Sequence, residues 1–586
     1  MKRTHPFVII DFKDELTSKR LIFKNPIQVI EAHSIEGVLP ALLRVEHTSR
    51  KKGLYAVGFV SYEAAPAFDA LFKVRAGTEL PLVWFGVFAK PDVIQHDEHK
   101  GRHDYFVGGW QPTTDKLKFD RDFQAIHTAI ARGETYQVNY TMRLQSSFDG
   151  EDLDFYEDIL AAGQGNYSAY LHTGRFRILS SSPELFFRRS GNRITMRPMK
   201  GTAPRGRFWQ EDEERISHLM NSDKDRTENV MIVDLLRNDL SQIAETGSVH
   251  VDELFTVEKY PTVLQMTSTV SATLHPEVGL AHIFSGLFPC GSITGVPKIK
   301  TMEIISHLES SPRNIYCGSI GLIMPTGDAV FNVSIRTVTI DADRKMAEYG
   351  VGAGITWASS SQGEYDEMMA KSAVLTNRQP SFDLLESMKI EDGQYTLLDR
   401  HLARLKQSAL YFDIAVDWEK LDAVLQNHLN QLPQNSVFRA RLRITQNGMI
   451  HLSSESLLNQ SVETRAIEIA DTPISRENPF LYHKTTSRDI YESHRQAHPA
   501  AFDVLLWNES GQLTEFTIGN LVLEVEGQMW TPPQDCGLLA GTYREELLAQ
   551  GRIGERVLYK SDLIQADRIW LINSIRGFVP VRLTQA

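Results

Sequence analysis

A break in the sequence pattern at residues 377–381 constrains the fold of this chain more than any other feature. A helical pattern that begins near Gln362 stops there, and Pro380 interrupts the backbone. Proline lacks the N–H group that a helix needs and clashes with the preceding turn. A chain of 586 residues is also too long for a single hydrophobic core. We therefore expect two domains, residues 1–378 and 379–586.

The composition excludes several classes of function. The chain has 62 Lys and Arg against 74 Asp and Glu, a net charge of −12, which argues against general binding to nucleic acid or anionic membranes. No apolar run approaches the roughly 20 residues of a membrane span, and the run near the start is too short for a signal sequence. The three cysteines (Cys290, Cys317 and Cys536) are too few for a disulfide framework and lack metal-ligand spacing. These features favour a cytoplasmic protein.

A lysine stands where a predicted strand opens into a loop. Residues 192–197 alternate between polar and apolar side chains, which predicts a strand, and Gly201, Pro204 and Gly206 predict a loop after it. Lys200 begins this loop. By itself it could be a solvated surface lysine, an ion-pair donor or, if partly desolvated, a nucleophilic amine.

Two polar residues interrupt runs that otherwise resemble strands. Glu184 lies among apolar neighbours in residues 176–187, where burial would raise its pKa and suit it to general acid catalysis. Gln137 lies in the alternating run 133–140. The alternatives are a glutamate that points outward and a glutamine at a sheet edge.

Two glycine-rich segments can bring the backbone close to a ligand. Residues 290–298 form a loop of glycines and hydroxyls that leads into a helix, with Pro297 and Lys298 at its start. Free N–H groups there, with the lysine, favour an anion, but the segment lacks the Gly-Lys-Ser/Thr ending of a Walker A loop. We expect residues 350–354 to form a second loop that can lie against a ligand.

Acidic residues on two predicted helices offer metal ligands. Glu364, Glu367 and Lys371 share one face of the helix that begins near Gln362, because they are three and four residues apart. Glu228 lies on the helix predicted for residues 223–240. Carboxylate oxygens suit Mg²⁺ better than zinc. A solvated acidic face is the alternative.

Taken in order, these motifs resemble the chorismate-utilising enzymes, the family of anthranilate synthase component I. The resemblance covers about residues 115–375, and residues 1–115 are less characteristic. It implies an α+β fold with a large two-sheet chorismate-binding sandwich. Lys200 stands where anthranilate synthases carry Ala, and lysine marks the branch of aminodeoxychorismate synthase component I, in which it attacks C2 of chorismate.

The resemblance assigns further roles in this domain. Glu184 matches the general acid for the departing hydroxyl. Gln137 falls where the isochorismate and salicylate synthases carry the lysine that activates water, so ammonia is the expected nucleophile. Gln265 stands where relatives often have His, and its role stays open. The implied Mg²⁺ ligands are Glu228, Glu364 and Glu367, and the implied substrate contacts are Gln137, Thr202, Thr294, Gly295, Tyr316, Arg336, Gly352 and Lys371.

The second domain resembles the fold-type IV pyridoxal-phosphate enzymes, which include the D-amino-acid aminotransferases, and in particular aminodeoxychorismate lyase. Lys484 matches the lysine that bonds to the cofactor and then moves protons, and Glu515 matches the partner of the pyridine nitrogen. The implied contacts to the cofactor phosphate are Arg404, Thr542 and Ser574. A lysine, a carboxylate and an arginine with hydroxyls form a chemically consistent set.

The two resemblances together imply a bifunctional enzyme of 4-aminobenzoate synthesis. The first domain would convert chorismate and ammonia into 4-amino-4-deoxychorismate with Mg²⁺, and the second would eliminate pyruvate with pyridoxal phosphate. No glutaminase is recognisable, so ammonia would come from solution or from a separate glutamine amidotransferase subunit. One alternative is an anthranilate synthase component I with an unrelated tail. In another, the second domain is an aminotransferase or a module without catalytic activity.

Overall fold

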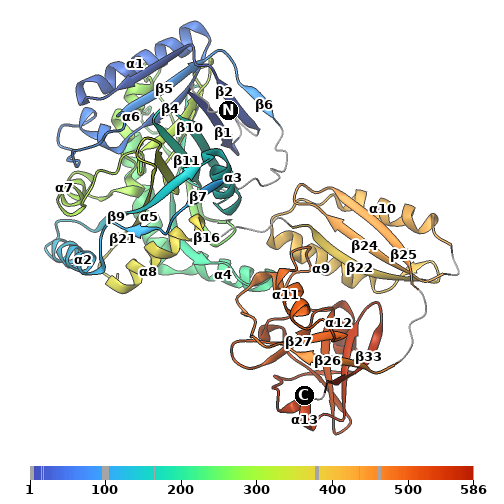
Figure 1. Cartoon of the computed structure of the whole chain (residues 1–586). Coiled ribbons are helices and arrows are strands. Elements are labelled where there is room, and N and C mark those ends of the chain that lie inside the picture. The colour runs from blue at the N-terminus through green and yellow to red at the C-terminus, as the bar shows by residue number, and fades with distance from the viewer. Residues whose placement is uncertain are drawn as a thin grey trace. The chain divides into compact units, whose positions relative to one another are not determined.

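The structure, a computed structural model, describes residues 6–14, 16, 19–94, 104–163, 165–376, 382–433, 436–457 and 463–584. It divides into two compact units, Met1–Ala203 with Ile216–Gln379, and Pro204–Arg215 with Pro380–Ala586 (Figure 1). The break predicted at residues 377–381 lies outside the described residues. The inclusion of residues 204–215 in the second unit has no counterpart in the sequence pattern.

The first unit contains two large sheets. The order of the 11-stranded sheet is β17 (Gly295–Val296), β9 (Gln137–Gly150), β21 (Met346–Ile355), β20 (Thr337–Asp341), β11 (Phe176–Ser182), β10 (Tyr167–His172), β1 (Phe7–Phe12), β2 (Arg20–Lys24) and β6 (Asp92–Ile94), with β7 (Tyr105–Val107) and β8 (Gln111–Pro112) paired to β9. The order of the 10-stranded sheet is β14 (Met199–Pro204), β16 (Val263–Thr273), β13 (Arg193–Arg197), β12 (Leu185–Ser190), β19 (Ala329–Asn332), β18 (Ser319–Ile323), β4 (Tyr55–Val60), β5 (Val83–Phe88) and β3 (Gln28–Ala32), with β15 (His250–Lys259) paired to β16.

The two sheets pack face to face through alternating side chains. Val8 and Ile10 of β1 share one buried cluster with Val57 and Phe59 of β4 and with Leu322 of β18. The side chains between them on β1 point to the opposite face, as the two-residue period of a strand requires. This arrangement confirms the two-sheet sandwich.

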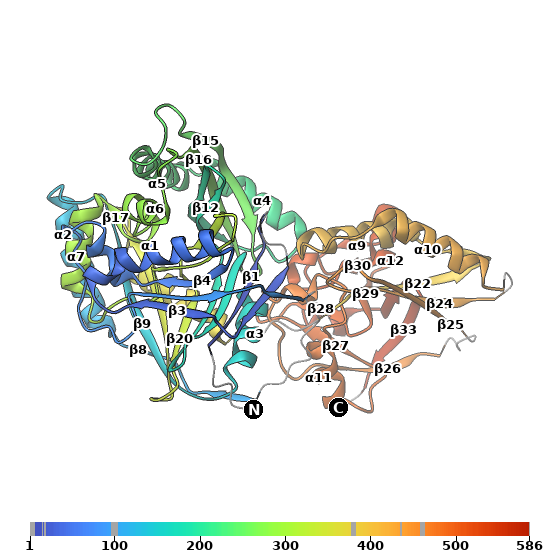
Figure 2. The ribbon, with the colours of Figure 1, turned by 90° about the horizontal axis from the view of Figure 1, so that it is seen from above.

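Helices cover the outer face of each sheet. Clusters around α2 (Lys116–Ala131), α3 (Asp152–Gly163) and α8 (Ser361–Lys371) cover the first sheet. Clusters around α1 (Ile35–Lys52), α5 (Asp223–Ser241) and α6 (Leu280–Leu287) cover the second, and Figure 2 shows α1 along β3 and β4. The remaining helices are α4 (Trp209–Asn221) and α7 (Lys298–Leu308).

The second unit has two smaller sheets. Their orders are β23 (Gln394–Tyr395), β22 (Leu384–Glu391), β24 (Phe438–Ile444) and β25 (Ile450–Ser456), and then β28 (Leu513–Phe516), β27 (Asp503–Trp507), β26 (Arg465–Ile469), β33 (Gly577–Leu583), β32 (Arg568–Asn573), β29 (Gly519–Val525), β30 (Gln528–Thr531) and β31 (Gly554–Glu555). The helices are α9 (Leu398–Tyr411), α10 (Trp418–Asn430), α11 (Asp489–Ala497), α12 (Thr542–Ala549) and α13 (Asp562–Gln565).

Two segments expected to be loops are strands. Lys200 and Gly201 belong to β14. Residues 350–354 belong to β21, and every residue of β21 pairs with a residue of β9. Glycine weakens strand propensity, but ladder hydrogen bonds to a long neighbouring strand override that preference. These glycines therefore bring their backbone close to a neighbouring strand of a sheet, and not to a ligand in a loop.

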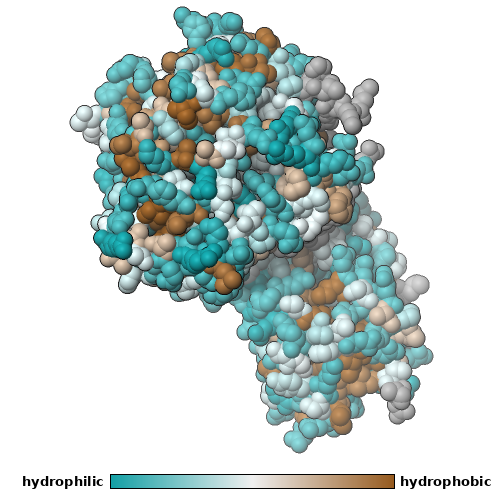
Figure 3. Space-filling model, turned by 60° about the vertical axis from the view of Figure 1, so that its left-hand side comes forward, coloured by the Kyte–Doolittle hydropathy of each residue, from teal (hydrophilic) through white to brown (hydrophobic). Residues whose placement is uncertain are grey.

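The described helices include none long and apolar enough to cross a membrane. The face of the molecule in Figure 3 is mostly hydrophilic, and its hydrophobic residues form scattered patches.

Candidate active sites

Lys200 is held in a partly buried position by the helix that faces β14. Its Nζ atom lies 3.3 Å from Oε2 of Glu228 on α5, and 18% of its side chain is exposed. Its backbone carbonyl accepts a hydrogen bond from Nδ2 of Asn229, whose Oδ1 accepts one from Ser268. The interpretation of Lys200 as a solvated surface lysine is therefore wrong. Asn229, which sequence reasoning missed, adjoins Glu228 in the same motif.

Gln265 fixes the backbone on the other side of this lysine. Its Nε2 donates to the carbonyl of Gly201 at 2.8 Å, and its Oε1 accepts from the hydroxyl of Thr202 at 3.0 Å. Gly201 has a φ of +101°, which disfavours any residue with a side chain. Gln265, whose role the sequence left open, thus positions the Lys-Gly-Thr part of β14. The side chain of Thr202 is bonded to Gln265, and its contact with substrate stays a prediction.

Glycines of β21 leave room for the groups around Lys200. A Cβ atom built on Gly354 would lie 2.5 Å from Nε2 of Gln137 and 2.8 Å from Nζ of Lys200, so these side chains meet over this glycine. Gln137 is 1% exposed, and its Oε1 has no hydrogen-bond partner among the described residues. A buried polar atom without a partner is costly, which points to a ligand at this position.

Glu184 has the properties expected of a general acid. It is buried, with 3% of the residue exposed, and burial raises its pKa to about 7 despite a short hydrogen bond from Ser292. That hydrogen bond, from Oγ of Ser292 to Oε1 of Glu184, is 2.6 Å long. The positive charge of Lys200 opposes the rise in pKa, which places both groups in one site. Ser292 lies in the predicted loop of residues 290–298, but the sequence did not indicate it as a site residue.

The loop before α7 contributes backbone more than side chains. Gly295 has a φ of +142°, and a Cβ atom there would lie 2.1 Å from the carbonyl of Gln137. The Thr294 hydroxyl donates to the carbonyls of Cys290 and Gly291, and the predicted contacts of Thr294 and Gly295 with substrate remain predictions.

The charge expected to attract an anion at this loop is neutralised. Nζ of Lys298 lies 2.8 Å from Oδ2 of Asp239. A lysine in such an ion pair loses most of its attraction for a second anion, so the expected anion site at this helix start is not supported.

Each of the three predicted metal ligands interacts with the charge of Lys200, Glu228 in an ion pair and Glu364 and Glu367 through their pKa values. Burial raises the pKa of Glu364, and the neighbouring charge of Glu367 raises it further, while Lys200 lowers it. Burial also raises the pKa of Glu367, but Lys371 and Lys200 outweigh this and lower it. With Glu228 beside Lys200, the site holds three hard oxygen donors of the kind that Mg²⁺ prefers.

These carboxylates do not form a closed ligand set by themselves. Among the residues that the structure describes, no three His, Cys, Asp or Glu side chains lie close enough together to hold a metal ion. Glu367 instead pairs with Lys371 at 2.7 Å, and Lys371 also donates to the carbonyl of Gly352 at 3.0 Å. The donor chemistry fits Mg²⁺, and the assignment of Glu228, Glu364 and Glu367 to it stays a prediction.

Tyr316 lies against the glycine face of β21, and Arg336 precedes the neighbouring strand β20. A Cβ atom on Gly350 would lie 2.2 Å from the ring of Tyr316, and one on Gly352 would lie 3.2 Å from its hydroxyl. The Arg336 guanidinium lies 5.6 Å from the ring centre of Tyr260, and no carboxylate within the described ranges pairs with it. Arg336 is therefore available to a ligand carboxylate.

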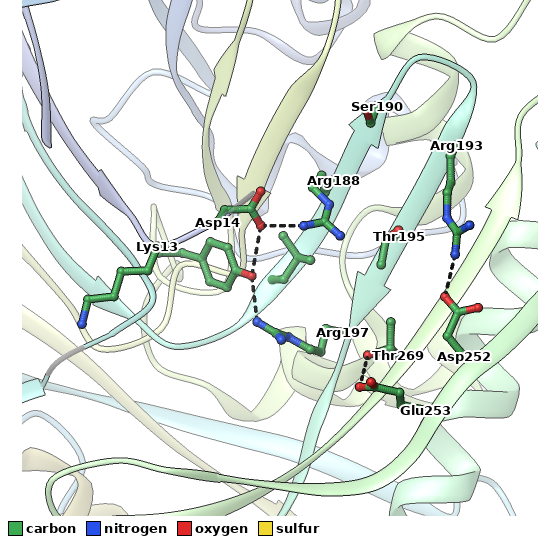
Figure 4. A pocket seen from close by; sticks show the side chains of 12 residues that line it. Lys13, Asp14, Arg188, Ser190, Arg193, Thr195, Arg197, Asp252, Glu253 and Thr269 are labelled. Atoms are coloured by element: carbon green, nitrogen blue, oxygen red, sulfur yellow. Dashed lines mark hydrogen bonds and ion pairs between the residues drawn. The ribbon is translucent and has the colours of Figure 1, made fainter. Parts of the chain in front are cut away.

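A separate open cavity of about 890 Å³ lies elsewhere on the second sheet (Figure 4). Its arginines are already paired with acids: Arg188 with Asp14 at 3.2 Å and Arg193 with Asp252 at 3.0 Å. Neither Lys200 nor Glu184 lines it, so it is distinct from the site described above.

In the second unit, Lys484 and Glu515 have pKa values displaced toward neutrality. Burial and the charge of Arg404 lower the pKa of Lys484 to about 7. Burial raises the pKa of Glu515 to about 7, although Tyr491 donates a hydrogen bond to it at 2.8 Å. A lysine that is about half uncharged near neutral pH can act as a nucleophile and as a base.

Arg404 is oriented by a buried carboxylate and keeps donors free. Its Nε and Nη2 donate to Glu386 at 2.9 and 2.7 Å, and Nη1 donates to the carbonyl of Ala540 at 3.2 Å. Burial alone would raise the pKa of Glu386, but Arg404 and His401 hold it at about 2. A guanidinium has five N–H groups, so Arg404 can still bind an anion.

The other predicted phosphate contacts lie at the ends of strands and helices. Thr542 begins α12, and its hydroxyl lies 3.3 Å from Nε2 of His401. Ser574 follows β32 in the turn that Asn573 closes by accepting from the N–H groups of Ile575 and Arg576. The lysine, carboxylate and arginine donors fit pyridoxal phosphate, and the roles of Arg404, Thr542 and Ser574 toward it stay predictions.

Comparisons with known proteins match a different family to each of the two parts of the chain. Residues 5–377 match the model of the family described as chorismate binding enzyme, and residues 383–584 match that of amino-transferase class IV. Aminodeoxychorismate synthase component 1 of Bacillus subtilis is 37% identical over 408 residues, which cover 62% of this chain and 86% of that protein. The protein of the same name from Salmonella typhimurium is 39% identical over 265 residues, which cover 45% of this chain and 58% of that protein.

Among solved structures, anthranilate synthase component I from Streptococcus pneumoniae superposes with a TM-score of 0.54 at 25% identity. The match covers 64% of this chain and 93% of that one. Both expected resemblances are thus confirmed at the level of the family. The chain belongs to the chorismate binding enzymes and carries, after that part, a unit of the fold-type IV aminotransferase family.

Proposed function

We propose that this chain makes 4-aminobenzoate in two steps. In the first, chorismate and ammonia give 4-amino-4-deoxychorismate at the site of Lys200. In the second, pyruvate is eliminated at the site of Lys484. The names of the relatives, together with the class IV aminotransferase match, support this pair of activities.

The observation that carries the first step is the position of Lys200. Its side chain is partly buried and meets that of Gln137 over Gly354, and its positive charge lowers the pKa of Glu184. We propose that Nζ of Lys200 forms a bond to C2 of chorismate while both ring double bonds shift, from C1–C2 to C1–C6 and from C5–C6 to C4–C5, and the C4–oxygen bond breaks. Glu184 gives its proton to the departing hydroxyl, which leaves as water.

Ammonia then completes the reaction at C4. Its nitrogen bonds to C4, both double bonds shift back, and the C2–nitrogen bond breaks to return the amine of Lys200. Each displacement is allylic, so nitrogen enters at the carbon from which oxygen left. Gln137 is uncharged and cannot activate water as a base, which supports ammonia as the nucleophile. A separate glutamine amidotransferase subunit is the proposed source, as the name "component 1" of the relatives suggests.

The metal and the cofactor have defined tasks in this proposal. Glu228, Glu364 and Glu367 would hold Mg²⁺, which offsets the negative charge of a bound carboxylate. Pyridoxal phosphate supplies an electron sink for the second step. Lys484 would move the proton during aromatisation, Glu515 would pair with the pyridine nitrogen, and Arg404 and Thr542 would bind the phosphate.

Replacement of Lys200 tests the first step. The Lys200→Ala variant should lose 4-aminated product by on the order of a thousandfold or more, because its nucleophile is gone. Mass spectrometry and chromatography of products from chorismate, ammonium and Mg²⁺ would measure this. Lys345→Ala is the control, since 67% of that side chain is exposed and it pairs with Asp149.

The same experiment distinguishes the proposed reaction from the main alternative, the reaction of an anthranilate synthase. An anthranilate synthase would place nitrogen at C2, so wild-type protein that yields the 2-aminated product would refute the proposal. Undiminished 4-amination by Lys200→Ala would leave the family assignment intact but would remove the covalent step.

A further inference from the structure

The second unit contains a cavity of about 200 Å³ beside two of the predicted phosphate contacts. Five parts of the unit form its walls: one face of α9, the residues just before Lys484, Gln534, the start of α12 and the segment 204–215. The segment contributes Phe208, Trp209 and Gln210 to this cavity. None of these three residues was identified from the sequence.

The segment 204–215 is firmly attached within the second unit. Nη2 of Arg205 donates to the carbonyl of Tyr411 at 2.6 Å, and the Tyr411 hydroxyl donates to the carbonyl of Gly206 at 2.8 Å. Asp212 is fully buried and binds both Arg205 and the N–H of Gly206. A fully buried carboxylate with several charge-assisted hydrogen bonds holds a backbone in one conformation.

Aromatic contacts hold the part of the segment nearest the cavity. The ring centres of Phe208 and Tyr482 lie 5.3 Å apart, and Nη1 of Arg207 donates to the Tyr482 hydroxyl at 3.0 Å. Tyr482 also lines the cavity, two residues before Lys484. The wall made by this segment is thus joined to the chain that carries the reactive lysine.

The groups that face the cavity favour a phosphate monoester. Arg404 keeps N–H groups that Glu386 and Ala540 do not use, and the first N–H groups of α12 lie at the same place. The nearby acid Glu545 is paired with Arg544 at 2.6 Å. The cavity therefore offers mainly positive and N–H groups.

A buried nitrogen on the cavity wall also lacks a partner. His483 is 5% exposed, and its Nδ1 lies 2.9 Å from the Ser408 hydroxyl. Its Nε2 has no well-formed hydrogen bond among the described residues, although the backbone of Arg207 in the segment 204–215 interacts with the ring and raises its pKa. Burial outweighs this interaction and lowers the pKa of the ring to about 3, so the ring is neutral. An unpartnered polar atom at the wall of a cavity is what a site awaiting a ligand leaves.

We propose that the segment 204–215 forms one wall of the binding site for the cofactor phosphate, with Trp209 and Gln210 beside the phosphate group. This inference rests on the proposed use of pyridoxal phosphate by the second unit. By sequence the segment lies inside the match to the chorismate binding family, residues 5–377, and Gln210 follows Lys200 by ten positions. One stretch of chain thus supplies residues to both sites.

Charge changes at Gln210 test this wall without disturbing a core, because this side chain is exposed. Gln210→Glu should weaken the binding of pyridoxal phosphate to the full-length apoprotein by about three- to tenfold, since like charges repel at short range. Gln210→Lys should leave it unchanged or strengthen it. Neither variant should alter the binding of pyridoxal, which has no phosphate. Titrations that follow the absorbance of the bound ligand would measure all four affinities.

Matched controls are Gln426→Glu and Gln426→Lys, because Gln426 is exposed on α10 and does not line the cavity. These controls should leave both affinities unchanged. If Gln210→Glu and Gln210→Lys leave the preference for pyridoxal phosphate over pyridoxal at its wild-type value, the proposed wall is refuted.

Tryptophan fluorescence gives a second measurement that does not depend on charge. Bound pyridoxal phosphate absorbs where tryptophan emits, so a tryptophan beside it is strongly quenched. Trp209→Phe should remove a large part of the quenching seen on titration, and Trp418→Phe on α10 should not. Equal quenching in both variants contradicts the inference. Wild-type protein that shows no Lys484-dependent absorbance refutes the cofactor proposal itself, which separates the two failures.

Discussion

At the scale of single residues, burial tunes the acid and the amine that the two proposed steps need. Glu184 and Glu515 are nearly inaccessible to water, and burial raises the pKa of each to about 7. Burial lowers the pKa of Lys484 to about 7 from the other direction. Desolvation always disfavours the charged form, so carboxylates gain and lysines lose proton affinity. Groups poised near neutral pH are efficient proton donors and acceptors.

The pKa of Glu184 predicts how the first step depends on pH. Because the acid must be protonated and its pKa is raised to about 7, kcat for amination should fall as pH rises through about 7. Glu184→Gln cannot donate this proton, so kcat should drop by about 10² to 10⁴ and that limb should vanish. Initial rates at saturating ammonia, measured from pH 5.5 to pH 9 and corrected for the ammonium equilibrium, would show both effects.

Glu63 provides a control of matched chemistry. It is also buried with a pKa raised to about 7, but it accepts hydrogen bonds from the N–H groups of Arg313 and Asn314 instead of facing Lys200. Glu63→Gln should lower stability and keep the descending limb in the pH profile of kcat. A Glu184→Gln variant that keeps this limb would remove Glu184 from the role of acid.

At the scale of elements, β14 and β21 bring the first site together. β14 presents Lys200 toward α5, where Glu228 meets it. β21 carries Gly350, Gly352 and Gly354 at every second position, so all three lie on one face of the strand. A strand face without side chains leaves space for the neighbouring groups and for a ligand.

Alanine at two of these glycines should have opposite effects. At Gly350 the new methyl group would lie 2.2 Å from the buried ring of Tyr316, and overpacking of this kind costs about 1–3 kcal/mol. At Gly354 it would meet the side-chain ends of Gln137, Lys200 and Asn139, and no backbone atom is among its three nearest neighbours. Gly354→Ala should therefore keep its free energy of unfolding within about 0.5 kcal/mol while kcat falls by about a hundredfold.

Urea unfolding and steady-state amination rates of the two variants would check this contrast. Gly350→Ala should unfold at a lower urea concentration, and its remaining folded fraction should retain more activity than Gly354→Ala. If Gly354→Ala has wild-type kcat, then Lys200 and Gln137 do not need their present positions, and the site has been placed wrongly.

At the scale of the whole molecule, each unit has its own core and its own reactive lysine. The buried clusters of the first unit involve both of its sheets, and those of the second unit involve its own two sheets. The two sites contain different functional groups. The first unit has hard oxygen ligands, and the second has an amine beside a buried carboxylate. We therefore expect that a change in one unit can abolish the activity of that unit and leave the activity of the other unit intact.

Removal of divalent metal and replacement of Lys484 should separate the two steps. EDTA should stop the consumption of chorismate and leave the absorbance of bound pyridoxal phosphate unchanged. Lys484→Ala should still consume chorismate at the wild-type rate, but 4-amino-4-deoxychorismate should accumulate in place of 4-aminobenzoate. Mass spectrometry of timed samples distinguishes the products. Lys420→Ala, an exposed position on α10, is the control.

These outcomes also identify which half of the proposal would fail. Full 4-aminobenzoate output from Lys484→Ala would mean that the second unit does not perform the elimination. Chorismate turnover that survives EDTA at the original rate would mean that Glu228, Glu364 and Glu367 do not act through a metal.

The sequence by itself determined the families, the two-sheet sandwich and most of the reactive groups. Motifs such as Lys200-Gly-Thr are local, and the chemistry of a lysine, a glutamate or an arginine does not depend on how the chain folds around it. Alternation and helical periodicity also reflect local burial, so α5, α7 and α8 were expected close to where they occur.

Only the tertiary structure decided how these groups are positioned. Gln265 reaches Gly201 across 64 positions, and Ser292 reaches Glu184 across 108, because strand register and packing bring them together. The same holds for β21, whose glycines become a strand by pairing with β9, and for residues 204–215, which join the second unit. Local propensity carries no information about such partners, because a hydrogen bond between distant segments forms only when the whole fold aligns them.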